Sequence, residues 1–185
     1  MQKRVIICDL DGTLIYENLE NIFVKFLLSK KKIKYKILFV SLFTLPINII
    51  RNKFYYPSIF KSWTYVLKNK FEDYKEEFFK HNIIHFNDKV ISLINSLDAD
   101  EVILLTGSYQ DLATELLENK GITLFNEVIG TKTEKNYFKI SRHPYGKGKV
   151  KYVNQSNYNI GIANEYSDHF YLDLCNEKYY INLEK

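Results

Sequence analysis

The sequence predicts an α/β protein built on an open, doubly wound parallel sheet with helices on both faces. Three apolar runs, at residues 4–8, 101–107 and 158–164, lack the period-two alternation of a half-exposed strand. Each run is therefore predicted to be a strand that is buried on both faces. Helices are predicted after the second and third runs, at 109–119 and about 166–174, and strands that alternate with helices are typical of such a sheet.

Further segments complete this predicted sheet. Residues 178–184 have the composition of one more strand, and residues 124–141 are predicted to form a strand that runs into a polar hairpin. The stretch "GKGK" at 146–149 is predicted to open a helix just before the strand at 158–164. The sequence contains no visible internal repeat or low-complexity linker.

Length and composition bound the class of protein. The chain has 185 residues, of which 46% are hydrophobic and 26% charged, as expected for one globular domain or a domain with an insert. Its net charge of +4 comes mainly from Lys, and the many Asn, Ile and Tyr residues suggest an AT-rich bacterial genome. Nucleic-acid binding is not expected, because the Lys-rich stretches lack ordered aromatic residues or a known module.

The cysteines and the N-terminus bear on the cellular compartment. Cys8 and Cys175 lie in apolar runs without metal-ligand spacing, so both are predicted to be buried free thiols in a reducing cytoplasm. The N-terminal sequence has neither the long apolar core nor the cleavage site of a secretory signal. The expected location is therefore the cytoplasm.

A long helical stretch separates the first two predicted strands. A crossover needs only a dozen or so residues, and apolar residues recur at helical spacing through this much longer stretch. We therefore predict a core of residues 1–17 and 86–185 and a helical cap of residues 18–85 that could cover the carboxyl edge of the sheet. The helices predicted here span residues 19–30, 33–50, 56–68 and 71–85, followed by a crossover helix at 87–98.

Polar clusters follow three of the predicted strands. In a doubly wound sheet, ligands bind where the carboxyl ends of the strands meet, near the switch in strand order. The clusters are therefore expected to converge on one crevice, and the Lys residues of "GKGK" offer a cation. The clusters consist of Asp9 and Asp11, of Thr106, Gly107 and Ser108, and of Asn164, Glu165 and Asp168.

These residue types together favour phosphoryl-transfer chemistry. Two close carboxylates and oxygen ligands from another loop suit Mg²⁺, which prefers few protein ligands together with waters and phosphate oxygens. A "TGS" turn at a helix start offers N–H groups and hydroxyls to an anion, and a Lys adds positive charge. Taken alone, Thr106 is equally explained as a helix cap. For "DLDGT" the alternative is a plain turn that ends a strand, which the other motifs in order disfavour.

The sequence resembles the haloacid dehalogenase (HAD) superfamily of phosphatases over nearly the whole chain. Four motifs occur in order: "DLDGT" after an apolar strand, the Thr of "LLTGS", a Lys before the last unit and the acidic "ANEYSD". The insert between the first two motifs resembles the C1-type cap of the phosphoserine-phosphatase-like subgroup (subfamily IB). The resemblance implies a Rossmann-like core with a small all-helical cap inserted after the first strand.

The resemblance implies a catalytic role for three residues. Asp9 would be the nucleophile that forms an aspartyl-phosphate, and Asp11 would be the general acid and then the base. Lys149 matches the family's Lys best, because Gly146 lies three residues before it and Val150 follows. Lys147, which would also bind substrate, is the alternative.

The resemblance also implies how phosphate and metal would be held. Thr106 and the amides of Gly107 and Ser108 would bind the phosphoryl oxygens. Mg²⁺ would be bound by the Asp9 carboxylate, the Asp11 main-chain carbonyl, Asn164 and Asp168.

Two positions depart from the family pattern. Asn164 stands where an acidic residue commonly binds Mg²⁺; its amide oxygen can ligate the ion but brings no charge, and neighbouring Glu165 is an alternative ligand. Asn18 stands where phosphoserine phosphatases have a Glu that reads the amino group of the substrate, with Glu17 one residue away. Phosphoserine is therefore not the expected substrate.

An apolar segment at residues 37–50 lies between basic flanks. It is too short to span a bilayer and is predicted to be a helix in the cap, kinked at Pro46. Alternatively, residues 31–53 would make a peripheral contact with an anionic membrane surface.

We therefore predict a Mg²⁺-dependent phosphomonoesterase that acts on a small phosphorylated metabolite such as a sugar, polyol or amino-alcohol phosphate. A role in bacterial surface-glycan synthesis is suggested by the resemblance alone. Two alternatives stay open: a related phosphatase of membrane lipid phosphates, and a catalytically silent binding domain, which Asn164 suggests. The sequence does not define the oligomeric state.

Overall fold

The chain divides into two compact units, which are described separately. The larger unit joins residues 1–19, 84–131 and 142–185, and the smaller unit joins residues 20–83 and 132–141. The computed structural model describes residues 2–30, 70–133 and 140–181, with the backbone alone at 133, 140 and 165–167. Residues 132–141, which the sequence analysis assigned to the core, therefore group with the smaller unit.

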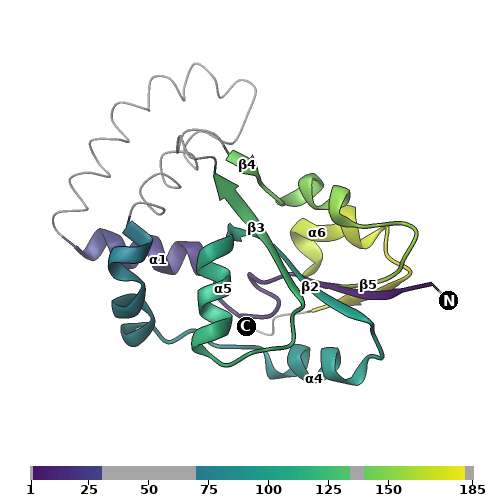
Figure 1. Ribbon diagram of the computed structural model, residues 1–185, viewed down its shortest axis with the longest axis horizontal. Helices are drawn as coiled ribbons and strands as arrows, with labels where there is room; N and C mark the ends of the chain where they lie inside the picture. Colours follow the sequence, from purple (N-terminus) through teal and green to yellow (C-terminus); the bar gives the residue numbers. More distant parts are fainter. Residues whose placement is uncertain (1, 31–69, 134–139, 182–185) are drawn as a thin grey trace, which may run out of the picture. The chain divides into compact units, whose positions relative to one another are not determined.

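The sheet has six strands in the order β4-β3-β2-β1-β5-β6 and is mostly parallel (Figure 1). β1 pairs in parallel with both β2 and β5, so the first strand of the chain lies at the centre. The strand order switches direction beside β1, as in a Rossmann-like, doubly wound fold, and the predicted fold class is confirmed. The strands are β1 (Arg4–Cys8), β2 (Glu101–Tyr109), β3 (Glu127–Thr133), β4 (Ile140–Arg142), β5 (Tyr158–Ala163) and β6 (Glu177–Tyr180).

Helices bury both faces of this sheet. Val5 and Ile7 of β1 pack in one cluster with Tyr171 and Leu172. Ile6 is fully buried and points to the opposite face, because side chains alternate along a strand. Figure 1 shows α4 and α5 on the side of the sheet away from α6. The helical elements are α4 (Asp88–Ser96), α5 (Gln110–Asn119), the 3₁₀ helix η1 (Gly146–Tyr152) and α6 (Glu165–Leu172).

The carboxyl end of β2 carries an irregularity that the sequence pattern did not predict. Leu105 pairs with Ile129 and Tyr109 pairs with Thr131, so four steps along β2 match two steps along β3. The two extra residues of β2 displace the "TGS" segment from the regular ladder, as in a β-bulge. The expected "TGS" turn at a helix start is wrong, because these residues lie within the strand and α5 begins only at Gln110.

Other predicted elements differ mainly at their ends. The helix expected at 71–85 covers residues 70–81, and the last strand ends at Tyr180. Cys8 and Cys175 are buried and free, as predicted. The helices predicted at 33–50 and 56–68, and the membrane contact predicted for 31–53, lie outside the described residues.

The smaller unit has an aromatic core between α1 (Leu19–Ser29) and the helical residues 70–81. The Phe23 ring lies edge-on to Phe78 at 4.9 Å and to Phe71 at 6.0 Å between ring centroids. Such aromatic pairs add to the stabilisation from burial itself. That this unit acts as a cap stays a prediction.

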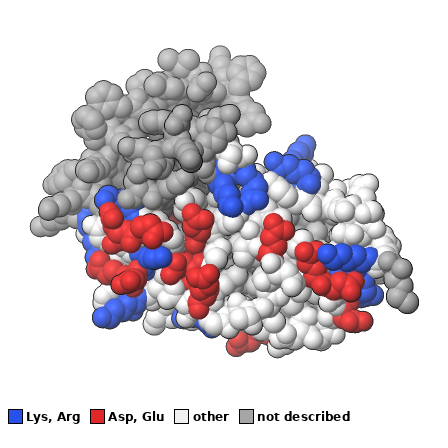
Figure 2. Space-filling model, in the orientation of Figure 1, with Lys and Arg blue, Asp and Glu red and all other residues white. Residues whose placement is uncertain are grey.

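The described helices and the surface charges bear on membrane contact. Within residues 2–30, 70–133 and 140–181, no helix has the length and apolar character needed to cross a membrane. On the face shown in Figure 2, acidic and basic side chains of the described residues are interspersed.

Two glycines of the sheet allow a comparison of close packing. A Cβ at Gly130 would lie 2.7 Å from the Gln110 Cα and 2.8 Å from the Ser108 carbonyl oxygen, which are backbone atoms. A Cβ at Gly161 would meet only the side chains of Leu172 and Cys175. Side chains can rotate away and backbone cannot, so Gly130→Ala should lower the free energy of unfolding by at least about 1 kcal/mol more than Gly161→Ala. Urea denaturation measures both, and equal losses would contradict the packing argument.

Candidate active site

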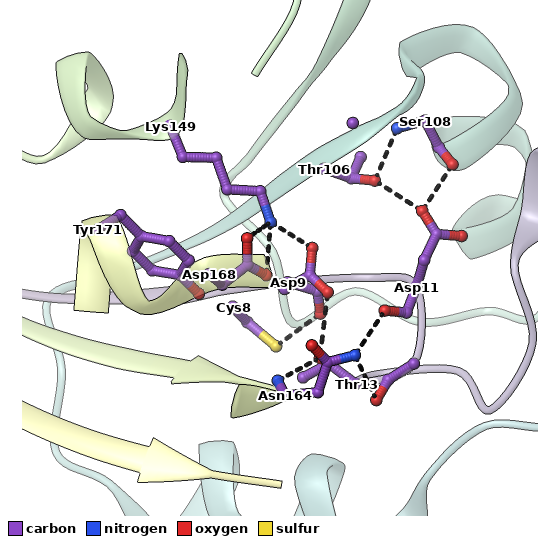
Figure 3. A network of polar contacts seen from close by, with 12 residues as sticks. Cys8, Asp9, Asp11, Thr13, Thr106, Ser108, Lys149, Asn164, Asp168 and Tyr171 are labelled. Carbon is purple, nitrogen blue, oxygen red and sulfur yellow. Dashed lines mark hydrogen bonds and ion pairs between the residues drawn. The ribbon is translucent and has the colours of Figure 1, made fainter. Parts of the chain in front are cut away.

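Four segments of the larger unit meet at the carboxyl ends of β1, β2 and β5 (Figure 3). They are the loop after β1, the end of β2, the helix η1 and the start of α6. Doubly wound sheets bind their ligands at this edge. The residues that hydrogen bonds and ion pairs join there are Asp9, Asp11, Thr106, Ser108, Lys149, Asn164 and Asp168.

A buried ammonium group lies at the centre of this cluster. Lys149 Nζ lies 2.5 Å from Asp9 Oδ1 and 2.8 Å from each oxygen of Asp168. All three residues are at most 5% exposed. Burial lowers the pKa of Lys149, but the charges of Asp9 and Asp168 outweigh burial and raise it above the usual value. Lys149 therefore holds a fixed positive charge beside Asp9 at neutral pH.

Asp168 adds a second carboxylate that one Lys does not fully balance. Burial, and then the negative charge of Asp9, raise the pKa of Asp168, and Lys149 offsets this only in part. Asp168 Oδ1 is buried and makes no hydrogen bond in its own right, although it lies within ion-pair distance of Lys149. The site therefore has an excess of negative charge that a further cation would stabilise.

The Asp9 carboxylate is held from both sides. Lys149 binds Oδ1, and the Thr13 hydroxyl donates a hydrogen bond to Oδ2 at 3.0 Å. The Asp9 amide donates to the Ile162 carbonyl at 2.9 Å, which ties this residue to β5. The carboxylate therefore has one defined orientation at the end of the central strand.

The Asp11 carboxylate points toward the end of β2 (Figure 3). Its Oδ2 accepts hydrogen bonds from the hydroxyls of Ser108 at 2.6 Å and Thr106 at 3.2 Å, and its Oδ1 accepts one from the Leu19 amide at 2.7 Å. Burial, and then the charge of Asp9, raise the pKa of Asp11 to about 6, against the opposing effect of these three donors. A carboxyl group with a pKa near the working pH can both donate and accept a proton.

The hydrogen bonding of the Asn164 side chain shows whether the site suits Mg²⁺. Its Nδ2 group lies 3.5 Å from the carbonyl oxygens of Asp11 and Gly12, the limit of hydrogen bonding, and its Oδ1 is buried without a partner. A cation near the Asp9 carboxylate and the Asp11 carbonyl would give this amide oxygen a partner. The residues fit the ion through a carboxylate, a main-chain carbonyl and an amide oxygen, although among the described residues no three His, Cys, Asp or Glu side chains form a metal-binding group.

The predicted phosphate-binding residues are engaged with one another. The Ser108 amide donates to the Thr106 hydroxyl at 3.0 Å, and both hydroxyls bind Asp11. The Gly107 carbonyl accepts a hydrogen bond from the Thr131 hydroxyl. The bulge in β2 therefore places this segment against the predicted acid, while its role toward phosphate stays a prediction.

The two candidate lysines lie in different surroundings. Lys149 is buried between carboxylates, whereas Lys147 is exposed and its Nζ lies 4.9 Å from the centre of the Phe170 ring. The structure therefore does not bring Lys147 into the cluster. The side chain of Glu165, the alternative metal ligand, lies outside the described part of the chain.

Sequence reasoning missed two hydroxyl groups of the site. Thr13 belongs to the quoted "DLDGT" motif but was given no role. Its hydroxyl donates a hydrogen bond to Asp9 and accepts one from the main-chain N–H of Asn164 at 3.0 Å. Thr131 lies on β3, and its hydroxyl contacts both Gly107 and His143. The motif could have pointed to Thr13, whereas no sequence signal marked Thr131.

The buried ion pairs can be tested by removing Lys149. Lys149→Met leaves two buried carboxylates without their cation, so in Mg²⁺-free buffer at pH 7.5 it should lower the free energy of unfolding by about 3 kcal/mol. The loss should shrink at pH 5, because protonated carboxyls need no cation. The exposed Lys147→Met is the matched control and should cost less than about 1 kcal/mol. Equal losses in urea denaturation would contradict this account.

The raised pKa of Asp11 predicts a pH-dependent stability. With its pKa raised from 3.8 to about 6, Asp11 stabilises the folded state while protonated, and this contribution is lost as the pH rises through 6. Asn cannot ionise, so Asp11→Asn does not lose stability as the pH rises through 6. Between pH 4.5 and 7.5 the free energy of unfolding of the variant should therefore rise by about 2 kcal/mol relative to wild type in Mg²⁺-free buffer.

A surface carboxylate serves as the control for this measurement. A hydrogen bond from Lys178 lowers the pKa of Asp173, so Asp173→Asn should show no such rise. A flat difference between Asp11→Asn and wild type across this pH range would show that Asp11 titrates normally.

Comparisons with known proteins agree with the fold. The family model for haloacid dehalogenase-like hydrolases matches residues 6–173. No protein with a curated description matches the sequence. Among solved structures, a Bordetella pertussis Tohama I protein of unknown function has a TM-score of 0.69 at 14% identity, over 96% of this chain and 89% of that one.

Two further structures are similar at lower scores. A HAD family hydrolase, t0658, from Salmonella enterica serovar Typhi has a TM-score of 0.52 at 10% identity, over 93% of this chain and 60% of that one. Phosphoserine phosphatase from T. onnurineus also has a TM-score of 0.52, at 13% identity, over 96% of this chain and 82% of that one. These likenesses concern the fold alone. Because the family model spans most of its length, the chain belongs to the haloacid dehalogenase-like hydrolase family.

Proposed function

We propose that this hydrolase is a Mg²⁺-dependent phosphatase of small phosphorylated metabolites that works through an aspartyl-phosphate on Asp9. One observation carries the proposal: a carboxylate oriented by Lys149 and Thr13 lies beside Asp11, a carboxyl group with a pKa of about 6. The fold neighbours include phosphoserine phosphatases, which supports this choice within the family.

The position of Asp11 favours phosphate-ester hydrolysis over halide displacement. A halide leaves as an anion and needs no proton, whereas an alkoxide leaving group must be protonated. Asp11 can supply that proton near neutral pH. The unpartnered oxygen of Asn164 and the excess negative charge around Asp168 also suit a cation that accompanies a phosphate.

The proposed reaction has two steps. Asp9 attacks phosphorus, the bond from phosphorus to the leaving oxygen breaks, and protonated Asp11 gives its proton to that oxygen. Asp11, now charged, takes a proton from a water molecule that attacks the aspartyl-phosphate, which releases phosphate and restores both side chains. Lys149 stays protonated throughout and stabilises the negative charge near Asp9.

Mg²⁺ would be held by the Asp9 carboxylate, the Asp11 carbonyl and Asn164, with Asp168 adjacent, and would supply positive charge toward the phosphate. Asn164 brings one negative charge fewer than an Asp would. We therefore expect the affinity for Mg²⁺ to be modest.

The surroundings of Glu17 support a substrate other than phosphoserine. Glu17 Oε1 lies 2.5 Å from His85 Nδ1, and its Oε2 accepts a hydrogen bond from the His85 amide at 3.2 Å. Both oxygens of this carboxylate are therefore engaged within the protein. A sugar, polyol or amino-alcohol phosphate stays the proposed substrate class, and the cytoplasm, a bacterial origin and surface-glycan synthesis stay predictions.

The second candidate function, which Asn164 suggests, is a binding domain without catalytic activity. It is favoured by the lack of a three-carboxylate metal group among the described residues, since a weakly bound ion gives little catalysis. Action on membrane lipid phosphates depends on residues 31–53, which the structure does not describe, and rests on the sequence alone.

Phosphate release from a panel of phosphorylated metabolites tests the proposal. Release should require Mg²⁺ and be abolished by EDTA. Asp9→Asn removes the nucleophile and should lower kcat/KM by a factor of about 10³ or more.

The exposed Asp173→Asn is the matched control and should keep wild-type activity. Release that persists in Asp9→Asn would rule out the aspartyl-phosphate route. If neither wild type nor Asn164→Asp releases phosphate from any compound, the silent binding domain becomes the better account.

A further inference from the structure

An exposed aromatic ring lies directly against the predicted phosphate-binding segment. Tyr145 is 59% exposed and is one of only four large hydrophobic side chains exposed in the described part of the chain. A Cβ added to Gly107 would lie 3.1 Å from Tyr145 Cδ2, so the ring covers the backbone of Gly107. The neighbours of Gly107 are Thr106 and Ser108, whose hydroxyls bind Asp11. The ring therefore borders the backbone of the segment that carries these two hydroxyls.

The Tyr145 ring is held in place on the protein side. It stacks on His143 with 5.7 Å between the ring centroids and 17° between the planes. The Tyr145 amide donates to the His143 carbonyl at 3.0 Å, and the Tyr145 carbonyl accepts from the Gly148 amide at 2.8 Å. A Cβ at Gly148 would lie 2.7 Å from the His143 carbonyl oxygen, so this loop is closely packed.

Hydrogen-bond directions define the state of His143. The single hydroxyl proton of Thr131 goes to the Gly107 carbonyl, so the Thr131 oxygen must accept at its contact of 2.8 Å with His143 Nδ1. His143 therefore carries a proton on Nδ1. Burial, and then the charge of Lys151, lower the pKa of His143, so the imidazole is neutral at pH 7. The stack under Tyr145 is then an uncharged pair of rings.

This connection also ties the ring to the phosphate-binding segment. Thr131 bonds both the carbonyl of Gly107 and the imidazole on which Tyr145 rests. Movement of the ring relative to Gly107 would break one of these bonds or the stack. A preorganised aromatic surface binds a flat partner at lower entropic cost than a mobile one.

We infer that Tyr145 is a specificity-determining residue that stacks on the leaving group of the substrate and favours leaving groups with a ring over small acyclic ones. The inference rests on the proposed phosphatase function. The phosphoryl group would occupy the site at Asp9, and the alcohol part, released beside Asp11, would lie along the exposed part of the Tyr145 ring. Ring faces pack well against an aromatic side chain, whereas a methyl group covers little of it.

Binding of two phosphonates tests this inference without requiring turnover. Calorimetry in the presence of Mg²⁺ would compare phenylphosphonate with methylphosphonate on the full chain. Tyr145→Ala should weaken phenylphosphonate binding about fivefold and leave methylphosphonate unchanged. Tyr145→Phe keeps the ring and should resemble wild type. Tyr180→Ala, which removes an exposed tyrosine from β6, is the matched control and should change neither affinity.

The outcomes separate this inference from the proposed function. If methylphosphonate binds and Tyr145→Ala leaves the ratio of the two affinities unchanged, or weakens both equally, the stacking role is wrong while the phosphate site stands. If wild type binds neither compound, the proposed function fails and the role of Tyr145 fails with it. With phenyl phosphate as substrate, Tyr145→Ala should raise KM and leave kcat unchanged, whereas a general structural defect would lower kcat for methyl phosphate as well.

Discussion

The site depends on the buried ammonium group of Lys149 and the two carboxylates that surround it. A buried charge is costly unless oppositely charged groups and hydrogen bonds compensate for the lost water. Asp9 comes from the end of β1, Asp168 from α6 and Lys149 from η1, so the compensation exists only when these three elements are assembled. The same ion pairs that orient the predicted nucleophile therefore also hold the carboxyl edge of the sheet together.

The central position of β1 explains why a small number of contacts is enough to connect the rest of the site. Its neighbours on either side end at the same edge, and each contributes polar groups to the loop that follows β1. The Thr106 and Ser108 hydroxyls of β2 donate hydrogen bonds to Asp11. The main-chain N–H of Asn164, directly after β5, donates one to Thr13. Thr13 also binds Asp9, so one small side chain links Asp9 to the residue that follows β5. The arrangement needs no long side chain other than Lys149.

Much of this architecture could be predicted from the sequence, because apolar runs without alternation mark strands that are buried on both faces. Parallel strands bring their carboxyl ends to one edge, which predicted that Asp9, Thr106 and Asp168 would converge. Lys149 could be distinguished from Lys147 only by its spacing from Gly146 in a family pattern, since composition treats both alike. Its burial in the structure agrees with that choice.

The register of β2 against β3 could not be predicted, because hydrophobic periodicity says nothing about how many residues of one strand match its neighbour. The two extra residues of β2 keep Thr106 and Ser108 within the strand, whereas the sequence pattern predicted a turn at a helix start. Thr131 was missed for the same reason: its partners lie across the sheet or in a later loop. Contacts of this kind depend on strand pairing, which a single sequence does not encode in a readable pattern.

The hydrogen bond from the Leu19 amide to Asp11 has a thermodynamic consequence for the start of α1. Leu19 is the first residue of that helix, and a carboxylate that accepts a hydrogen bond at a helix N-terminus stabilises its first turn more than a neutral acid does. Asp11 is therefore a helix cap as well as the predicted proton carrier. Since linkage works in both directions, each proton that Asp11 gains or loses changes the free energy of forming the first turn of α1.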